Sequence, residues 1–270
     1  AVPAGRRARV PVLCHFHHPA IKRAYYLWLV KYADHRIYPS EYTRRHSLEK
    51  AGLDGDVVHN GVDVDVFRPR ARREGDLRER LGLPRDAIVV GQVGALVPHK
   101  RPRLLLEAFA HAVARLPSLH LCLVGKGPEE QALRDRVAAL GLEGRVVMTG
   151  FVESVVPYYQ EVIDINVLAS VEEGLGISVI EGSACGLPAI VADSTGLRET
   201  VEPNVTGLTF PPDDERALTE LMLKLAGDGE LRRSLGAAGR EMVESKFSLA
   251  AYHAGVVAAV ARVQGATRAA

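Results

Sequence analysis

The sequence predicts an α/β fold with one complete doubly wound parallel sheet, preceded by part of a second domain of the same kind. The first observation is that short aliphatic runs alternate with amphipathic stretches from residue 87 onwards. The second is that these runs are apolar throughout, which is typical of parallel strands covered by helices on both faces. The third is a polar, arginine-rich segment at 68–76, which only two predicted strands precede, too few for an independent sheet.

The alternation predicts the elements in order along the chain. Strands are predicted at 10–16, 56–60, 87–94, 119–125, 145–150, 163–169, 189–193 and 208–210. Helices are predicted at 20–32, 42–51, 101–116, 128–140, 154–162, 176–185, 214–226 and 230–246, from apolar residues at helical spacing or from helix-start residues. Right-handed crossovers between parallel strands then place a ligand site at the carboxyl ends of the strands.

The same pattern divides the chain into four parts. Residues 1–67 are expected to be the C-terminal part of an N-terminal domain, and 68–76 a linker. Residues 77–246 are expected to form the complete domain. Residues 247–270 are expected to form a helix that packs back towards the N-terminal part. The chain begins without methionine, and we expect it to be part of a longer polypeptide.

Composition narrows the class of protein. Hydrophobic residues make up 47% and charged residues 25%, which is a globular composition. No apolar run approaches the ~20 residues of a membrane span, and no signal sequence opens the chain, so we expect a cytoplasmic protein. The three cysteines match no metal-ligand spacing and are expected to be buried thiols.

The net charge of +1 gives no reason to expect a nucleic-acid partner. Residues 1–50, however, carry ten Lys or Arg against three acidic residues. We favour a solvated surface for this excess, with peripheral contact to an anionic membrane or a phosphorylated substrate as the alternative.

Three glycine-rich turns, at 91–100, 125–128 and 174–176, are candidates for anion binding at the strand ends. None matches the P-loop or the dinucleotide fingerprint. Lys100 and Arg101 follow the first turn and could supply cations to a phosphate pair. A solvated helix start is the alternative, but cations there oppose the helix dipole, which favours a functional role.

Glu173 and Glu181 flank the third turn. Glu181 falls within an otherwise apolar predicted helix, where a carboxylate needs a partner. That partner is either a group within the protein or the hydroxyls of a bound sugar or ribose. Glu173 precedes the turn and is either a helix-capping acid or a second ligand group. Spacing alone leaves these alternatives open.

The segment EGLGISVIEGSACGLPAIVAD (173–193) resembles the E-x7-E signature of retaining, nucleotide-sugar-dependent glycosyltransferases of the GT-B fold, family four, also called group 1. Other segments are similar to the same family in the same order: 33–52, 57–67, GALVPHKRPRLLLEAFA (94–110), LCLVGKGPEEQAL (121–133), 146–170 and 204–214. The resemblance covers nearly the whole chain. It implies two Rossmann-like domains and a hexosyltransferase that needs neither a cofactor nor a metal.

The resemblance also implies roles for individual residues. Glu181 would hold the ribose hydroxyls, Glu173 the hydroxyls of the donor sugar, and Lys100 the leaving diphosphate. The remaining donor-binding positions would be Gly94, Arg101, Gly125, Val152 beside the base, and the backbone at Leu175, Gly176, Ile177 and Ser178.

The family also places a histidine near the reacting sugar carbon. His17 fits that register best, with His15 and His18 as alternatives. Ala95 stands where the family commonly has arginine, which removes one cation from the phosphate site.

The expected reaction is transfer of a sugar from a nucleotide-diphosphate sugar to an acceptor hydroxyl on a sugar, a lipid-linked compound or a small molecule. Much of the usual N-terminal domain, which carries acceptor contacts, is absent from the chain. A nucleotide-sugar binding module without turnover is therefore an alternative. A sugar-nucleotide hydrolase or epimerase on the same fold is another. The base, the sugar and the acceptor stay open.

Overall fold

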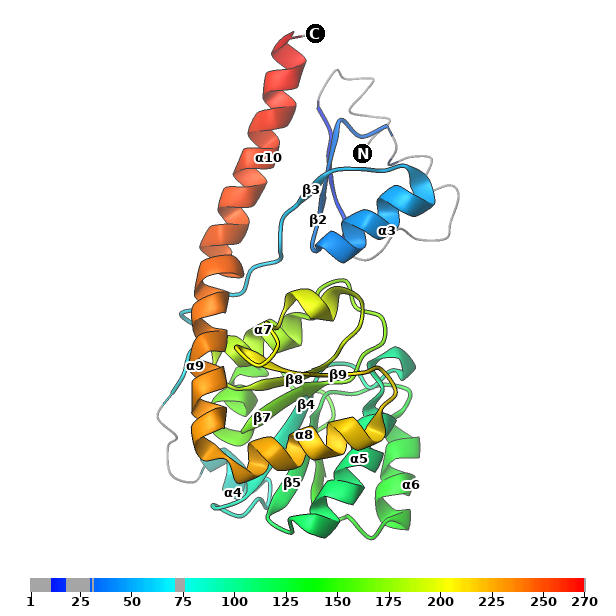
Figure 1. Ribbon diagram of the computed structural model, residues 1–270, viewed down its shortest axis with the longest axis vertical. Coiled ribbons are helices and arrows are strands. Elements are labelled where there is room, and N and C mark those ends of the chain that lie inside the picture. The colour runs from blue at the N-terminus through cyan, green and yellow to red at the C-terminus, as the bar shows by residue number, and fades with distance from the viewer. Residues whose placement is uncertain (1–10, 18–29, 31, 71–75, 270) are drawn as a thin grey trace.

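The computed structural model describes residues 11–17, 30, 32–70 and 76–269 of the chain. Figure 1 shows a small N-terminal unit above a larger C-terminal domain, with α9 and α10 forming a column beside both. The predicted helix at 20–32 lies almost entirely outside the described residues. The α/β class with parallel sheets is confirmed.

The C-terminal domain is built on a six-stranded parallel sheet in the order β6-β5-β4-β7-β8-β9. Its strands are β4 (Ile88–Val93), β5 (Leu119–Val124), β6 (Val146–Met148), β7 (Ile165–Leu168), β8 (Ala189–Ala192) and β9 (Gly207–Phe210). The α-helices are α4 (Asp76–Arg80), α5 (Pro102–Arg115), α6 (Glu130–Ala139), α7 (Ile177–Ala184), α8 (Glu215–Gly227) and α9 (Gly229–Lys246). Short helices are η1 (Pro98–Lys100), the π-helix η2 (Tyr158–Val162) and η3 (Thr195–Glu199).

Alternate residues of the central strand pack into different cores. Val90 belongs to the larger cluster, with Phe109 of α5 and Met222 of α8. Val89 belongs to the smaller cluster on the other face, with Tyr159 of η2. All five side chains are almost fully buried. This two-sided burial explains why the strand sequence is apolar throughout rather than alternating.

A buried ion pair joins α4 to the sheet. The guanidinium of Arg78 donates to the carboxylate of Asp164 at 2.6 Å and to the carbonyl oxygens of Ala87 and Val162. The same carboxylate oxygen accepts the backbone N–H of Val89 at 2.8 Å. The network connects α4 with the residues immediately before β4 and β7.

The N-terminal unit holds a three-stranded parallel sheet, β1 (Leu13–His15), β2 (His35–Tyr38) and β3 (Asp56–Val57), and the helix α3 (Glu41–Ala51). The expectation of two strands was wrong: β2 escaped it because two polar residues precede its buried Ile37 and Tyr38. The strand expected at 56–60 pairs only at 56–57, since the chain then turns towards the other domain.

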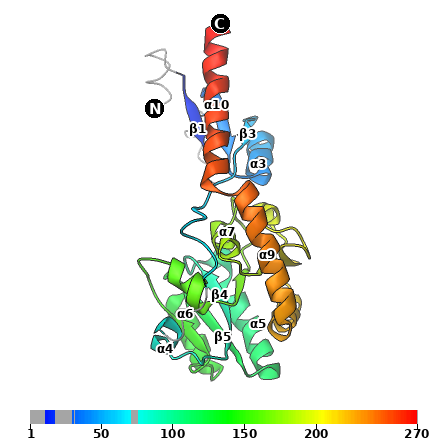
Figure 2. The same cartoon turned by 90° about the vertical axis from the view of Figure 1, so that its left-hand side faces the viewer.

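The helix α10 (Leu249–Ala269) packs on the N-terminal unit, where Ala259 lies in one cluster with Ile37 and Val58. Figure 2 shows it running alongside β1 and β3. The connection between the units lies against the joint of α9 and α10. There the backbone of Val62 bonds to Phe247 at 2.8 Å and to Leu249 at 3.0 Å.

Candidate functional site

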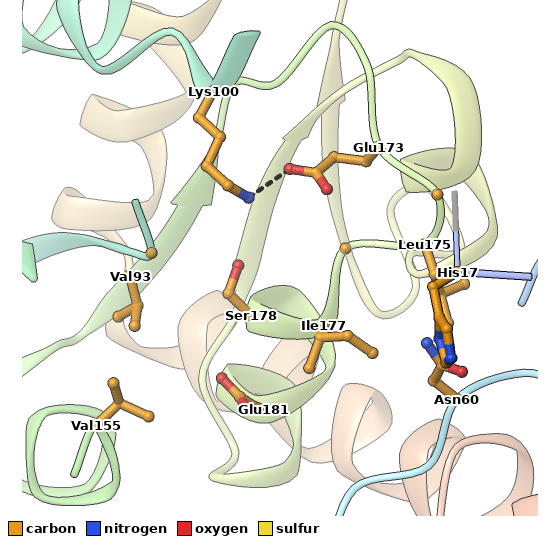
Figure 3. A pocket seen from close by; sticks show the side chains of 13 residues that line it. His17, Asn60, Val93, Lys100, Val155, Glu173, Leu175, Ile177, Ser178 and Glu181 are labelled. Carbon is orange, nitrogen blue, oxygen red and sulfur yellow. Dashed lines mark hydrogen bonds and ion pairs between the residues drawn. The ribbon is translucent and has the colours of Figure 1, made fainter. Parts of the chain in front are cut away.

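A cleft of about 440 Å³ opens where the carboxyl end of β4 meets the N-terminus of α7, and both units line it. The C-terminal domain contributes most of the lining: Val93, Gly94, Lys100, Val155, residues 173–178 and Glu181. The N-terminal unit contributes His17, and the connection that follows β3 contributes Asn60. Figure 3 shows Val93 and Val155 on one side of this cleft and His17 and Asn60 on the other.

Lys100 and Glu173 form an ion pair within the cleft. Nζ of Lys100 lies 2.5 Å from Oε1 of Glu173, and both side chains are mostly buried. The hydroxyl of Ser170, directly after β7, donates to the same oxygen at 2.9 Å. The turn η1 carries Lys100, and its His99 carbonyl accepts the Val171 N–H at 3.0 Å. This places a cation and a carboxylate, both with remaining hydrogen-bonding capacity, at one point of the cleft.

The loop from Glu173 to Gly176 is held from behind by η3. The N–H of Glu173 donates to Oγ1 of Thr195 at 3.0 Å, and the Gly196 N–H donates to the Glu173 carbonyl at 3.1 Å. Gly196 approaches so closely that an added Cβ would lie 2.2 Å from the Gly174 oxygen. The loop is therefore fixed by backbone contacts that require glycine.

The N-terminus of α7 faces the cleft. Its N-cap is Gly176, in the left-handed conformation with φ 87°, which contributes no side-chain cap to the first turn. The first N–H groups of a helix have no acceptor within the helix, and they carry partial positive charge. Leu175, Ile177 and Ser178 line the cleft at this point. The arrangement can bind an anion such as a phosphate.

Glu181 lies one turn further along α7, mostly buried. Its Oε2 accepts a hydrogen bond from the hydroxyl of Tyr159 at 3.1 Å. Burial, only partly offset by this bond, raises the pKa of Glu181 to about 7. The partner that a buried carboxyl requires is thus a neutral tyrosine of η2, a residue that the sequence reasoning missed. The remaining carboxyl oxygen can accept hydroxyl donors from a ligand.

Two predicted residues shape the cleft without lining it. Gly125 has φ 134°, and an added Cβ would lie 2.1 Å from the carbonyl oxygen of Gly94. It therefore supports the loop at the end of β4, where Gly94 itself lines the cleft. Val152 packs against the smaller core cluster.

Arg101 does not line the cleft and forms an ion pair with Asp213. Its backbone is in the left-handed conformation and caps α5. Ala95, the position without the usual arginine, is exposed. Lys100 is thus the cation that lines the cleft in the described part of the chain.

Of the three candidate histidines, His17 lines the cleft. Its ring lies 4.2 Å from that of His15, centroid to centroid, and His15 in turn stacks on Tyr252 of α10 at 5.9 Å. Burial and the neighbouring His17 lower the pKa of His15 to about 4, so His15 is neutral. His18 lies outside the described residues.

Three other predictions concern the cysteines, metal binding and membrane-spanning helices. Cys122 and Cys185 are buried and Cys14 partly so, all as free thiols. Among the described residues, no group of three or more His, Cys, Asp or Glu is placed to hold a metal. None of the helices in the described part is long and apolar enough to cross a bilayer.

The basic N-terminal residues are only partly described. Arg36 donates to the carbonyl oxygens of Val30 and Ala33. Arg44 and Arg45 both pair with Glu41. These three guanidinium groups have partners within the protein, and membrane contact through this part stays a prediction.

Comparison with known proteins agrees with the fold. The structure aligns with the crystal structure of Anabaena Alr3699/HepE in complex with UDP, with a TM-score of 0.86 at 22% identity over 97% of this chain and 75% of that one. It also aligns with sucrose-phosphate synthase from Thermosynechococcus elongatus, with a TM-score of 0.82 at 26% identity over 97% and 71%. The architecture is that of the GT-B glycosyltransferases.

The chain belongs to the family of glycosyl transferases group 1, whose model matches residues 74–242. A second model, glycosyltransferase family 4, matches residues 1–66. The family predicted from the motifs is therefore confirmed.

Two curated relatives are similar over most of this chain. One is the GDP-mannose-dependent monoacylated alpha-(1-6)-phosphatidylinositol monomannoside mannosyltransferase of Corynebacterium glutamicum, 34% identical over 78% of this chain and 58% of its own. Another is the alpha-D-kanosaminyltransferase of Streptomyces kanamyceticus, 30% identical over 77% and 55%. The chain thus spans less than three fifths of the length of these relatives.

Proposed function

We propose that the cleft binds a nucleotide-diphosphate sugar and that the chain is part of a retaining, metal-independent hexosyltransferase. The observation that carries this proposal is the convergence of Lys100, Glu173, Glu181 and the N-terminus of α7 on one cleft. These groups suit the three parts of such a donor: a diphosphate, a sugar and a ribose. The relatives support it, since one structure contains UDP and one curated relative is named as GDP-mannose-dependent.

The diphosphate is assigned to Lys100 and the first N–H groups of α7. A primary ammonium and a helix N-terminus each stabilise phosphate charge, and more strongly in a partly buried site than in water. In the structure, Nζ of Lys100 lies 2.5 Å from Oε1 of Glu173. Donor binding then exchanges one anionic partner of Lys100 for another and frees Glu173 to accept hydroxyls of the sugar.

The ribose is assigned to Glu181. Its free carboxyl oxygen accepts a ribose hydroxyl, while Tyr159 keeps its position through the other oxygen. Val93 and Val155 flank the same end of the cleft and offer apolar contact to the nucleoside. Val152, Gly125 and Arg101 do not line the cleft. In this proposal Gly125 acts through the loop at Gly94, which it supports.

Transfer takes place at the sugar face that His17 and Asn60 approach. The bond between the sugar C1 and the phosphate oxygen breaks, and the acceptor oxygen bonds to C1 on the same face. The acceptor proton passes to the departing phosphate oxygen. Lys100 and the α7 N-terminus stabilise the charge that develops on this diphosphate, which is the work of a preorganised electrostatic site rather than of acid–base carboxylates.

Calorimetry with UDP, GDP and ADP, and with their sugar conjugates, tests the proposal. We expect one base to bind at least tenfold more tightly than the others, and Glu181→Ala to weaken that binding at least tenfold. Absence of binding by all three nucleotides would overturn the donor site.

A turnover assay on the full-length protein, with product analysis, separates the candidate reactions. A glycosylated acceptor with the donor's anomeric configuration supports retaining transfer. Donor consumption without such a product indicates a hydrolase or an epimerase. Binding without turnover by the 270-residue chain is the result expected if acceptor contacts lie in the remaining length of the relatives.

A further inference from the structure

The N-terminus of α3 is capped by a residue from the other domain. Oε2 of Glu199 accepts the backbone N–H of Glu41, and Oε1 accepts that of Tyr42, each at 2.8 Å. Ser40 caps the next N–H, that of Thr43, at 3.0 Å. Two of the N–H groups that a helix cannot satisfy internally are therefore satisfied by a carboxylate 157 and 158 residues away.

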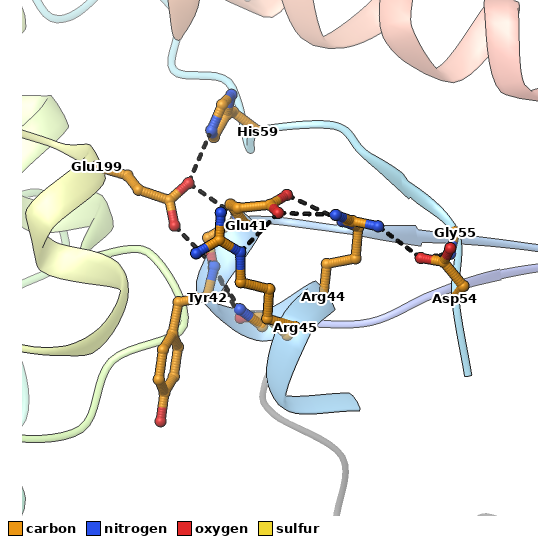
Figure 4. A network of polar contacts seen from close by, with 10 residues as sticks. Glu41, Tyr42, Arg44, Arg45, Asp54, Gly55, His59 and Glu199 are labelled. Carbon is orange, nitrogen blue, oxygen red and sulfur yellow. Dashed lines mark hydrogen bonds and ion pairs between the residues drawn. The ribbon is translucent and has the colours of Figure 1, made fainter. Parts of the chain in front are cut away.

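This carboxylate is held ready for that contact. Nε2 of His59, in the connection between the units, lies 3.3 Å from Oε2 of Glu199. Figure 4 shows the side chain of Glu199 reaching towards the start of α3, with His59 on its other side. Burial would raise the pKa of Glu199, but the bonds from His59, Tyr42 and Glu41 outweigh it and lower the pKa. The group is an anion at the positive end of a helix.

The short helix that carries Glu199 is also the support of the cleft loop. Thr195 and Gly196 of η3 bond to the backbone of Glu173, as described above. From the opposite side, the hydroxyl of Thr43 in α3 donates to the Gly174 carbonyl at 3.3 Å. The start of α3, the helix η3 and the loop at Glu173 and Gly174 thus meet at one polar junction.

Hydrogen bonds connect the parts of this junction. A second cavity, of about 530 Å³, opens between α3 and η3 and is lined by charged and polar side chains of both. Removing the carboxylate of Glu199 therefore leaves the N–H groups of Glu41 and Tyr42 without this acceptor, while the bond from Thr43 to Gly174 remains.

We infer that Glu199 is a positioning residue that holds the N-terminal unit over the donor cleft. His17 reaches the cleft from that unit and Asn60 from the connection that follows β3, whereas Lys100, Glu173 and Glu181 belong to the C-terminal domain. Loss of the cap therefore makes the position of His17 and Asn60 over the cleft less fixed, but leaves the cleft residues of the C-terminal domain in place. The expected effect on turnover rests on the proposed function. The contact between Glu199 and the N-terminus of α3 does not depend on that function.

The experiment compares Glu199→Gln and Glu199→Ala with the matched control Glu202→Gln. Glutamine keeps the size of Glu199 but replaces one acceptor oxygen with an NH₂ group that cannot cap an N–H. Glu202 lies three positions further on and is exposed. Hydrogen exchange measures the protection of the amides at 41–43, and small-angle scattering measures how the two units are held together.

For both Glu199 variants we expect exchange at 41–43 to accelerate at least tenfold and the radius of gyration to increase. Nucleotide affinity should stay within twofold of wild type, while kcat of the full-length enzyme falls at least tenfold. The Glu202 control should match wild type in all four measurements.

Unchanged exchange and scattering in both Glu199 variants would overturn the inference. So would a loss of nucleotide affinity as large as the loss of kcat, because that would place the effect within the C-terminal domain. If the wild-type protein binds no nucleotide, the proposed function fails, and exchange with scattering still decides whether Glu199 holds the two units together.

Discussion

The hydroxyl of Tyr159 lies 3.1 Å from Oε2 of Glu181, so this carboxyl group of the cleft has a neutral partner. A carboxyl in this setting ionises less readily than one in water, and the pKa of Glu181 rises to about 7. The site thus holds a group whose charge changes within the physiological range. A ligand that donates hydroxyl groups favours its ionised form, which links ligand binding to proton release.

Nucleotide-sugar affinity should therefore increase with pH up to about 7 and then level off. A bound ribose donates to the carboxylate and lowers the pKa of Glu181, so that binding near pH 6 releases a proton. Calorimetry in two buffers of different ionisation enthalpy counts that proton. The sugar conjugate is the proper ligand, because the terminal phosphate of a free diphosphate also titrates near this pH.

Glu181→Gln provides the control for this linkage. Its affinity should not vary between pH 5.5 and pH 8, and no proton should be released on binding. In the unliganded protein the raised pKa means that ionisation opposes folding above the ordinary carboxyl pKa of about 4.3. The substitution should accordingly raise the melting temperature by more at pH 8 than at pH 5. A wild-type affinity that is independent of pH would contradict the assignment of Glu181 to the ribose.

Removal of Lys100 should weaken diphosphate binding more than nucleoside binding. Lys100→Ala should lower the affinity for the nucleoside diphosphate and the kcat/KM of the full-length enzyme at least tenfold each, about 1.4 kcal/mol or more. Its effect on the nucleoside alone should be less than twofold. Lys224→Ala, at an exposed position on α8, is the matched control. Equal losses for nucleoside and diphosphate would show that Lys100 does not contact the phosphates.

Glu173→Gln should act in two opposite directions. Because Glu173 holds Lys100 in the unliganded protein, its neutralisation should free the ammonium and tighten binding of the free diphosphate several-fold. The same change removes a strong acceptor for sugar hydroxyls, so kcat/KM should fall at least tenfold. Titration with the diphosphate and steady-state kinetics measure the two effects. A weaker affinity for the diphosphate would contradict competition between Glu173 and phosphate for Lys100.

Gly125→Ala should distort the loop at the end of β4. The added Cβ would meet the Gly94 carbonyl oxygen at 2.1 Å, and the residue has φ 134°. Backbone strain of this kind costs about 1–3 kcal/mol. Urea unfolding should show that loss, together with weaker nucleotide binding. Gly144→Ala, where an added Cβ meets nothing within 4 Å, should leave both unchanged. Equal stability of the two variants would mean that the loop adapts freely.

The pair of Arg78 and Asp164 should behave as a buried unit. Asp164→Leu alone leaves a buried guanidinium without its anion, which typically costs about 3–5 kcal/mol. The double variant Arg78→Met and Asp164→Leu should recover part of that loss, although the Val89 N–H then has no side-chain acceptor. Urea unfolding of the two single variants and the double variant measures the coupling. Additive losses would show that the two charges do not interact.

Much of the architecture followed from the sequence because it depends on local pattern. Continuous apolar strands predicted a sheet covered on both faces, and glycine turns after β4 and before α7 predicted where its cleft opens. The strand β2 was missed because its first two residues are polar, so the local sequence shows no apolar run. Its Ile37 and Tyr38 are buried by residues from other parts of the chain. The structure adds a backbone contact between Gly125 and Gly94 that the sequence did not indicate, and donor binding by Gly125 stays a prediction.

The sequence alone therefore determined the α/β class, the family, and the grouping of Lys100, Glu173 and Glu181 at one edge of the sheet. The tertiary structure decided what each of these groups contacts. Glu173 meets Lys100 across 73 residues, and Glu181 meets Tyr159 across 22. Glu199, which the sequence did not single out, reaches α3 across 158. Local patterns encode burial and turns, but such partners are selected by the order of strands in the sheet and by the way in which the two units meet.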